Sequence, residues 1–291
     1  MENISEPYTI RYPEIVAIAS EDGETVELIE TFDCIGGAMW AGHHFRKSPL
    51  VKSVRTTGNK QRFILKTGSS ELDLEGSFFP AGISAVSLDE DGILISYRGM
   101  GGGGVGASVC RASANGVISC TTTPSGGGRV AGSTIRLPRH RRVLIGIDDT
   151  DTPEEGATWT LAHNIARAAE DADSRYLSHT IVQLFPVPYR TKNCVGIVLE
   201  FATSDPARLA DRVQALLEKY TLSDETGMAV FTGFDPSPLE AFGQAVKKGE
   251  VSREDLERVL RHVDVRIDGR GLIGAVGAIP FATRYEEALR I

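Results

Sequence analysis

The sequence predicts an α/β (α+β) protein with a β-rich domain over residues 1–140 and a ferredoxin-like domain with extra C-terminal helices over residues 141–291. Short stretches of alternating apolar and polar residues fill the first part, which is typical of half-buried strands. In the second part, apolar runs and helical patterns follow one another in the order β-α-β-β-α-β, the split βαβ arrangement. A basic segment with a proline, RLPRHRRV at residues 136–143, separates the two parts and indicates a linker.

The first domain is expected to consist of hairpins interrupted by glycine-rich segments. Strand patterns on both sides of short turns predict hairpins at residues 15–32, 62–76 and 85–97. The segments GMGGGGVGASVC (99–110) and SGGGR (125–129) break this pattern. Glycine lets backbone N–H groups close around a phosphate, but glycine runs also form plain loops, and neither segment has the Gly-Lys-Ser/Thr ending of a P-loop. A ligand role for the first segment therefore stays open beside the structural one.

The second domain alternates strands and helices. Strands are expected at residues 143–147, 179–185, 194–202 and 227–234, with helices at 158–172 and 206–220. Two further helices are expected at 239–249 and 253–263, the latter opened by Ser252 and Asp255 in a spacing close to that of a capping box. Residues 264–279 then predict a strand, a tight glycine turn and a short apolar helix.

The composition is that of a water-soluble globular protein. Of the 291 residues, 41% are hydrophobic and 24% charged, and the net charge of −8 disfavours a large nucleic-acid surface, which needs a surplus of Lys and Arg. The longest apolar runs fall well short of the roughly 20 residues of a spanning helix. The N-terminal residues lack the basic flank and apolar core of a secretion signal. We therefore expect a cytoplasmic protein without a DNA or membrane partner, and we leave a homodimer open.

The cysteines and the paired histidines form no clear metal or disulfide pattern. No Cys-x-x-Cys pair is present, which argues against a zinc ribbon, and we expect reduced cysteines, although Cys110 and Cys120 could face each other across a hairpin. His43 and His44, with Cys34 nearby, suggest a metal. Adjacent histidines point apart in a strand, however, and no second ligand pair has metal spacing. Contact with a partner or substrate is the preferred role for the two histidines.

The segment VLIGIDDTDTPEEGATWTLAHNI (143–165) carries most of the candidate chemistry. An apolar strand ends in Asp148, Asp149 and Asp151, and a helix follows. The carboxyl end of a strand that faces a helix N-terminus is the usual phosphate site of α/β proteins. Three acids there would repel a phosphate unless Mg²⁺ lies between them, because this cation binds carboxylate, water and phosphate oxygens together. The segment therefore predicts a Mg²⁺ and nucleotide site.

Strand geometry limits how many of these acids bind the metal directly. Asp148 and Asp149 point to opposite faces unless the strand has already ended. We therefore expect two direct ligands, preferably Asp148 and Asp151, with Asp149 orienting water or a basic partner. The alternative is that the acids form Asx-turns and complement the helix dipole.

The residues that follow the acids offer hydroxyl groups and an aromatic ring. Thr158 and Thr160 could each present a hydroxyl at the helix N-terminus, where free N–H groups would stabilise a transferred phosphoryl group. Ordinary N-capping explains a threonine equally well. Trp159 could stack on a base, although packing against the sheet is the preferred interpretation.

Two further segments supply candidates for contact with phosphate. A basic and polar turn between two strands consists of Arg190, Thr191, Lys192 and Asn193. Arg190 or Lys192 could neutralise phosphate charge, and a solvated hairpin turn is the alternative. The second segment, Gly269, Arg270 and Gly271, precedes a helix, and its glycines permit close approach of the backbone to an anion.

These motifs together carry a family resemblance. The string IGIDDTD (145–151) with the following Thr152, Pro153 and Gly156 resembles the signature of the kinase-like domain of archaeal tRNA agmatinylcytidine synthetase. That enzyme family uses ATP and Mg²⁺ to activate a cytidine of an isoleucine tRNA by phosphorylation. Further similar segments are LFPVPYRTKNCVG (184–196), EAFGQAV (240–246) and GRGLIGAVGAI (269–279). The resemblance covers roughly residues 143–282 and implies that Asp148, Asp149 and Asp151 carry the metal and the nucleotide.

The rest of the chain departs from that family. A β-rich domain comes first here, and no cysteine ribbon follows the kinase-like part. The whole chain resembles methanogenesis marker protein 11, a family of methanogenic archaea. In the synthetase family a threonine of a Cys-Thr-Thr string takes part in phosphate transfer, whereas alignment on Gly156 places Trp159 at that position. A covalent phosphothreonine step is therefore in doubt.

The leading functional hypothesis is an ATP/Mg²⁺-dependent phosphotransferase-like protein that activates an unknown acceptor and is associated with methanogenesis. Phosphoryl and nucleotidyl transfer both remain open. A protein or a small molecule is favoured over RNA as the acceptor, because the chain is acidic and lacks the nucleic-acid-binding modules of the synthetase family. The alternatives are a non-catalytic nucleotide-binding assembly or sensing module, and an RNA (tRNA) modification enzyme.

Overall fold

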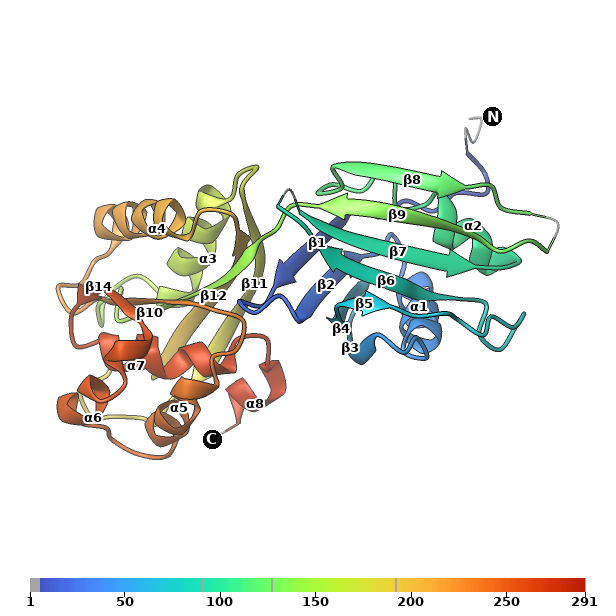
Figure 1. Ribbon diagram of the computed structural model, residues 1–291. Helices are drawn as coiled ribbons and strands as arrows, with labels where there is room; N and C mark the ends of the chain where they lie inside the picture. The colour runs from blue at the N-terminus through green and yellow to red at the C-terminus, as the bar shows by residue number, and fades with distance from the viewer. Residues whose placement is uncertain (1–5, 91, 127, 192, 291) are drawn as a thin grey trace. The chain divides into compact units, whose positions relative to one another are not determined.

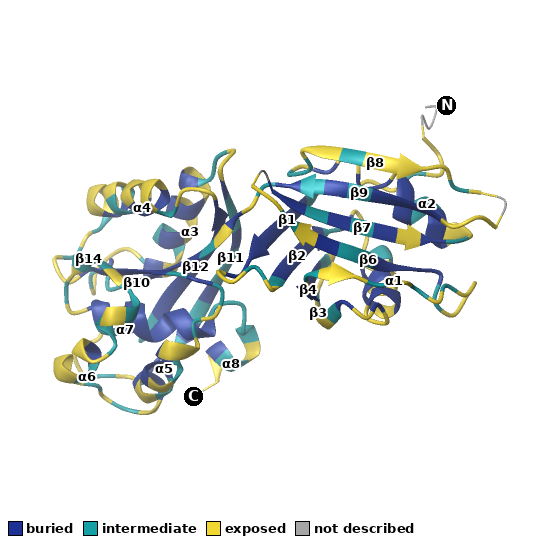
Figure 2. Cartoon of the chain, in the orientation of Figure 1, coloured by how far each residue is buried: buried dark blue, intermediate teal, exposed yellow. Residues whose placement is uncertain are grey.

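The chain divides into two compact units, residues 1–140 and residues 141–291 (Figure 1). The structure is a computed structural model that describes residues 6–90, 92–126, 128–191 and 193–290. Each unit encloses its own core, and the cartoon in Figure 2 colours the buried residues dark blue. Across the described ranges, no helix combines the length and the apolar character needed to cross a bilayer.

Two antiparallel sheets enclose the core of the first unit. The strand order is β1-β2-β4-β3 in one sheet and β5-β6-β7-β9-β8 in the other. One core cluster draws side chains from both sheets, including Leu28 and Phe63 from the first and Ile83 and Ile95 from the second. The elements are β1 (Glu14–Ala19), β2 (Thr25–Thr31), α1 (Ile35–Phe45), β3 (Val51–Thr57), β4 (Lys60–Lys66), β5 (Gly68–Ser69), β6 (Ala81–Leu88), β7 (Ile93–Gly99), α2 (Gly102–Ser108), β8 (Ser119–Thr123) and β9 (Ala131–Leu137).

The β-rich character of this unit is confirmed, but two local predictions are wrong. The hairpins at 15–32 and 85–97 are present as β1–β2 and β6–β7. The expected hairpin at 62–76 is absent, because β4 pairs on both edges with β2 and β3. The glycine run at 99–110 forms the helix α2 rather than a loop. Gly103 makes this possible, since a Cβ there would lie 2.6 Å from the carbonyl oxygen of Pro80.

A buried ion pair lies in the core of the first unit. The side chains of Arg111 and Glu30 are 1% and 0% exposed, and Arg111 Nε lies 2.6 Å from Glu30 Oε1. The Tyr97 hydroxyl donates to the same oxygen at 2.8 Å. The guanidinium group lies over the ring of Tyr97, 3.9 Å from its centroid. Hydrogen bonds and an aromatic ring thus replace the water that both charges lose.

The second unit has the predicted ferredoxin-like topology with one added strand. Its sheet order is β11-β12-β10-β13-β14, and every neighbouring pair is antiparallel. The first four strands in chain order therefore follow the split βαβ arrangement, with β14 on the β13 edge. The elements are β10 (Arg141–Asp148), α3 (Thr158–Ala169), β11 (Ser174–Gln183), β12 (Val195–Thr203), α4 (Pro206–Tyr220), β13 (Gly227–Thr232), α5 (Glu240–Lys248), α6 (Arg253–Glu257), β14 (Asp264–Asp268), α7 (Leu272–Ala278) and α8 (Tyr285–Leu289).

Helices cover both faces of this sheet, which explains the continuous apolar run of β10. Val143, Ile145 and Ile147 pack in the cluster that contains α3 and α4, whereas Leu144 packs in the cluster that contains α5 and α7. Alternate side chains of one strand thus enter two separate cores. The helix expected at 253–263 is shorter than predicted: α6 ends at Glu257 behind the confirmed capping box of Ser252, and a 3₁₀ turn at Leu260–His262 redirects the chain into β14.

Helix α7 lies unusually close to the sheet. A Cβ on Gly146 of β10 would lie 2.0 Å from the carbonyl oxygen of Ala275, and one on Gly227 of β13 would lie 2.0 Å from the amide nitrogen of Leu272. A Cβ on Gly196 of β12 would likewise lie 2.6 Å from the carbonyl oxygen of Gly274. Three neighbouring strands therefore each carry a glycine where the helix backbone rests on them.

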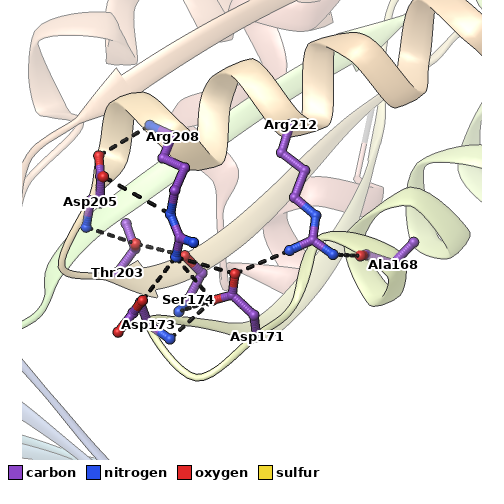
Figure 3. Close-up of polar contacts among 8 residues, drawn as sticks. All are labelled: Ala168, Asp171, Asp173, Ser174, Thr203, Asp205, Arg208 and Arg212. Carbon is purple, nitrogen blue, oxygen red and sulfur yellow. Dashed lines mark hydrogen bonds and ion pairs between the residues drawn. The ribbon is translucent and has the colours of Figure 1, made fainter.

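On the other face, a network of ion pairs ties the end of α3 to α4 (Figure 3). The Asp171 carboxylate accepts hydrogen bonds from the amides of Asp173 and Ser174 and pairs with Arg208 and Arg212 at 3.2 and 3.1 Å. Arg212 also donates to the carbonyl of Ala168 at 2.6 Å. The network is partly exposed, so its contribution is orientation of α3 more than stability.

The buried ion pair leads to a stability prediction. Glu30→Gln should lower the free energy of unfolding of the first unit by about 3–5 kcal/mol, because it leaves the Arg111 charge buried without its partner. The control is Arg136→Met, which breaks a partly exposed pair with Asp89 but keeps the aliphatic stem, and should cost about 1 kcal/mol or less. The free energy of unfolding of both variants is measured by urea denaturation monitored through hydrogen exchange of the β2 and β7 amides. Equal losses for the two variants would contradict the account.

Candidate active site

The candidate site is built on the carboxyl end of β10. The strand ends at Asp148, and the next residue, Asp149, has a positive φ of 54°, which turns the chain sharply. Asp tolerates this conformation better than most residues, but it is uncommon and often marks a functional site. The Thr226 hydroxyl donates to the carbonyl of Asp149 at 3.1 Å and holds the turn against β13. Asp148 and Asp149 therefore do not alternate as strand residues would.

The Asp148 carboxylate lies against α7. Its Oδ1 accepts the amide of Asp149 at 2.9 Å, and its Oδ2 occupies the space beside Gly274, where a Cβ would be only 1.8 Å away. Gly271, just before α7, is equally confined, since its Cβ would lie 2.7 Å from the Asp148 carbonyl oxygen. The close approach of α7 to the sheet thus sets the position of this carboxylate.

The environment of the acids favours their neutral forms when no cation is bound. Burial raises the pKa of Asp148 well above its usual range, and the neighbouring Asp149 charge raises it further. Burial also raises the pKa of Asp149, while the Arg270 guanidinium opposes that shift. In the described ranges no Lys or Arg forms an ion pair with Asp148. A cation that entered here would relieve a cost that the fold leaves uncompensated.

Two small hollows meet at these acids. Both are lined by Asp148, Asp149, Asn193 and Val195. One, which we call the Arg270 hollow, has a volume of about 60 Å³, and the other, the Trp159 hollow, about 70 Å³. Each has room for an ion with one or two water molecules, since a water occupies about 30 Å³ in the liquid. The remainder of any nucleotide would lie on the open surface outside them.

The Trp159 hollow opens onto the N-terminus of α3. It is lined further by Asp151, Ala157, Thr158, Trp159 and Thr191. The first amides of a helix have no intrahelical acceptor, so this end attracts anions. The Thr158 hydroxyl accepts hydrogen bonds from the amide and the hydroxyl of Thr150 at 3.2 and 3.1 Å. Trp159 is 48% exposed, so the expectation that it packs against the sheet is wrong.

The Arg270 hollow brings together basic side chains from separate parts of the chain. Arg190 and Arg270 line it with Gly271 and the two shared acids. Arg270 lies 5.2 Å from the ring centroid of Tyr189, and its amide donates to Glu225 at 3.1 Å. The structure thus places two guanidinium groups beside the carboxylates, an arrangement suited to phosphate oxygens around a shared cation.

Some residues singled out from the sequence lie elsewhere. The Thr160 hydroxyl donates to the Ala157 carbonyl at 2.8 Å and faces a different depression, on the side of Leu161. Gly269 lines neither hollow and packs against the backbone of Glu225. Asp151 lines only the Trp159 hollow, where its Oδ1 accepts the Thr191 hydroxyl at 3.1 Å. Lys192 lies outside the described residues.

The paired histidines are not part of this site. His43 and His44 lie in α1, not in a strand, and the side chain of Cys34 caps that helix by accepting the amide of Gly37. All four cysteines are free, so the Cys110–Cys120 pair is not a disulfide. Sequence reasoning missed Tyr189, Cys194 and Gly274, which line the Arg270 hollow. The feature of the sequence that could have pointed to Gly274 is its position three residues after Gly271.

The donor set fits Mg²⁺ shared with a ligand rather than a metal enclosed by protein. Within the described ranges, no three His, Cys, Asp or Glu side chains converge as a metal-binding group. Mg²⁺ is usually held by one or two carboxylates together with water and phosphate oxygens. Asp148 and Asp149, which line both hollows, match that pattern better than Asp148 and Asp151. Metal binding here would displace protons from carboxyls whose pKa values are raised.

Comparison with known proteins decides the family. The chain is 37% identical over 294 residues to the uncharacterized protein MJ0921 of Methanocaldococcus jannaschii, an alignment that covers 97% of this chain and 98% of that protein. The chain belongs to the MJ0921 family. Because MJ0921 is itself uncharacterized, membership in this family does not indicate an activity for the chain.

The second unit also matches proteins of known name. Residues 144–269 match the model of the TiaS TCKD domain. The tRNA 2-agmatinylcytidine synthetases TiaS of Methanocorpusculum labreanum and Methanopyrus kandleri are each 28% identical to it, over 143 and 148 residues. Each alignment covers 47% of this chain and 34% of the synthetase. The chain thus spans about a third of the length of these relatives. The resemblance of the second unit to this enzyme family is confirmed. The assignment of the whole chain to methanogenesis marker protein 11 stays a prediction.

Solved structures are similar to the same part of the chain. A complex of TiaS with its tRNA and ATP is 24% identical and has a TM-score of 0.44, covering 48% of this chain and 36% of that one. A complex of TiaS with its tRNA, AMPCPP and agmatine is 22% identical with a TM-score of 0.42, covering the same shares.

These matches correct the expectation for the acceptor. The sequence interpretation favoured a protein or a small molecule over RNA, and that preference is wrong. The named relatives of the second unit are tRNA agmatinylcytidine synthetases, which conflicts with a preference against RNA. Net charge is a poor guide to this question because it averages over the whole chain, whereas contact with a nucleic acid depends on local groups.

The confinement of the Asp148 carboxylate can be tested with one methyl group. Gly274→Ala should displace this carboxylate and lower the free energy of unfolding by about 1–3 kcal/mol, the usual cost of overpacking. Gly249→Ala is the matched control, because Gly249 lines the same hollow but has no neighbour within 4 Å of an added Cβ. Thermal unfolding and a crystal structure of each variant measure the effects. An unmoved Asp148 in Gly274→Ala would refute the packing argument.

Proposed function

We propose that the second unit binds ATP with Mg²⁺ at the acids after β10 and uses it to activate an RNA acceptor, so that the chain is an ATP-dependent RNA-modifying enzyme. One observation carries the proposal. Asp148 and Asp149 share the Arg270 hollow with Arg190 and Arg270, all in the unit that is similar to TiaS. Two acids, two guanidinium groups and a neighbouring helix N-terminus are the groups that phosphoryl or nucleotidyl transfer needs.

Each side chain has a role that follows from its position. Asp148 and Asp149 would hold Mg²⁺, which supplies neutralisation of phosphate charge when it is bound. Arg190 and Arg270 would bind phosphate oxygens from the Arg270 hollow, and Asn193, which lines both hollows, would donate hydrogen bonds. Asp151 would orient Thr191 through the hydrogen bond already present.

Activation without a phosphothreonine fits the region around α3 best. Trp159 stands where the synthetase family has its transferring threonine, and an indole cannot carry a phosphoryl group. The Thr158 hydroxyl lines the Trp159 hollow but accepts two hydrogen bonds from Thr150. We therefore propose direct transfer to the acceptor, with the α3 N-terminus stabilising negative charge.

An RNA acceptor is supported by the relatives and by the surroundings of the hollows. Two exposed aromatic side chains line the hollows: Trp159 lines the Trp159 hollow, and Tyr189 lines the Arg270 hollow together with Arg190 and Arg270. Aromatic rings next to guanidinium groups are suited to unstacked bases and phosphates of RNA. We propose tRNA as the class of RNA, following the names of the relatives of this unit.

Nucleotide binding should depend on the acids. Asp148→Asn and Asp149→Asn should each weaken Mg²⁺-dependent ATP binding tenfold or more, at least about 1.4 kcal/mol, because each removes a negative ligand of the cation. Asp224→Asn, at an exposed acid of the same unit that lines neither hollow, should bind as the unchanged protein does. Titration calorimetry with and without Mg²⁺ gives the affinities. Undiminished binding in the first two variants would refute the site.

The RNA acceptor can be tested separately. Bulk archaeal tRNA should be retarded in gel shifts and should stimulate release of ADP, or of AMP and pyrophosphate, from ATP. Binding through about three phosphates should weaken on the order of 40-fold between ~50 and ~200 mM salt. A non-catalytic nucleotide-binding module would instead bind ATP without any release in the presence of tRNA. That result would overturn the enzymatic part of the proposal.

A further inference from the structure

A large cavity with an apolar lining lies in the first unit. It has a volume of about 630 Å³, within the range of small-molecule pockets, which is roughly 300–1,000 Å³. Helix α1 contributes Trp40 and Phe45, and the strands and their flanks contribute Tyr12 and Phe32. Helix α2 contributes three glycines together with Val105 and Ala107. We call it the Trp40 cavity.

The glycines of α2 fall into two groups with different reasons to lack a side chain. Gly103, which also lines the cavity, and Gly104 are packed, since an added Cβ would lie 2.6 Å from the Pro80 carbonyl oxygen and 3.2 Å from that of Gly99. Gly102 and Gly106 line the cavity, and an added Cβ would meet nothing within 4 Å at either. Glycine inside a helix costs about 1 kcal/mol relative to alanine. Packing explains the first pair but not the second.

Gly102 and Gly106 are four residues apart, so they lie on the same face of the helix. Without side chains, that face presents flat backbone to the cavity. A side chain at either position would project into the open volume and reduce it. The physical effect of Gly102 and Gly106 is therefore to leave part of the helix wall free of side chains, beside Val105 and Ala107 of the same helix, which also line the cavity.

The charges of the cavity are already satisfied inside the protein. Among the described residues of its lining, Arg111 is the one with a charged side chain, and both Glu30 oxygens accept from it at 2.6 and 3.0 Å. A third donor of Arg111 reaches the Gly106 carbonyl at 2.9 Å. A charged ligand would find no counter-ion in this lining, so the lining selects an uncharged one.

The Tyr12 hydroxyl is a polar group of the lining that can bind a ligand. The Tyr12 side chain is 7% exposed and lines the cavity, yet its hydroxyl has no hydrogen-bond partner among residues 6–90, 92–126, 128–191 and 193–290. Burial raises the pKa of this phenol, so the hydroxyl remains a neutral donor. Ser77, which also lines the cavity, has an uncommon positive φ of 69°. Both features are typical of ligand sites.

We propose that the Trp40 cavity binds an uncharged planar aromatic ring, held between the glycine face of α2 and the aromatic side chains, with the Tyr12 hydroxyl donating to an acceptor atom of the ring. Planarity follows from the part of the helix wall that is free of side chains, and aromatic character follows from Tyr12, Phe32, Trp40 and Phe45. The ring can belong to a free heteroaromatic compound or to a base of a nucleic acid. This inference does not depend on the acids after β10.

Ligand-observed NMR with the full-length protein tests it, using quinoline as the planar probe and cyclohexanol as the non-planar control. Quinoline should bind at least tenfold more tightly than cyclohexanol. Gly106→Leu should fill the cavity and weaken quinoline binding tenfold or more, while its thermal midpoint is no lower than that of the unchanged protein. Tyr12→Phe, which keeps the ring and removes only the hydroxyl, should weaken binding about fivefold.

Three results would overturn the proposal: no quinoline binding, equal binding of the two probes, or undiminished binding by Gly106→Leu with its fold intact. Adenosine and a short single-stranded oligoadenylate distinguish the two sources of the ring. Binding of both that is lost in Gly106→Leu assigns a base, and binding of quinoline alone assigns a free compound. Asp148→Asn should leave these affinities unchanged, which separates this cavity from the nucleotide site.

Discussion

The close packing of α7 on the sheet is the constraint on which the candidate site depends. Glycines on β10, β12 and β13 let the helix backbone rest where a Cβ would collide, at 2.0 to 2.6 Å. Because α7 lies that close, Gly271 and Gly274 lie beside Asp148, and Arg270 comes to the Arg270 hollow with Arg190. A helix at the usual distance from the sheet would leave the acids in a wider, wetter groove. The geometry of the carboxylates is thus a consequence of three absent side chains.

The two units handle buried charge in opposite ways. In the first, Arg111 and Glu30 neutralise each other, and aromatic rings cover the guanidinium group. In the second, Asp148 is partly buried beside another acid, and in the described ranges it has no basic partner within ion-pair distance. The first unit thus pairs its buried charges with each other, whereas the described part of the second unit provides no basic partner for Asp148. That contrast distinguishes a structural ion pair from a group of acids suited to an external cation.

Much of the second unit could be predicted from the sequence. Its strand order follows from alternating apolar runs and helical patterns, and the acids at the end of β10 are visible as a local string. Asp149 was expected to orient water or a basic partner, and the Arg270 guanidinium does oppose the rise of the Asp149 pKa. Nothing local in the sequence shows that two residues so far apart in the chain come close to each other. That encounter depends on glycine contacts that are visible only in three dimensions. Local patterns therefore reveal the acids but not the groups around them.

The first unit shows where local rules fail. The glycine run at 99–110 has poor helix propensity, yet its residues Gly102–Ser108 form α2 because close contact with Pro80 and Gly99 outweighs that propensity. Residues 62–76 have a hairpin pattern, yet β4 is an inner strand whose two partners come from earlier in the chain. His43 and His44 were considered as strand residues, whereas they lie in α1, a helix of eleven residues that contains three glycines. In each case long-range packing decides.

A crystal structure of the full chain with Mg²⁺ and a non-hydrolysable ATP analogue tests the central claim most directly. The account predicts a cation bound by Asp148 and Asp149, with phosphate oxygens at Arg190 and Arg270 and anionic groups at the α3 N-terminus. Acids that pair only with arginine or water, with no nucleotide beside them at saturating concentration, would contradict it.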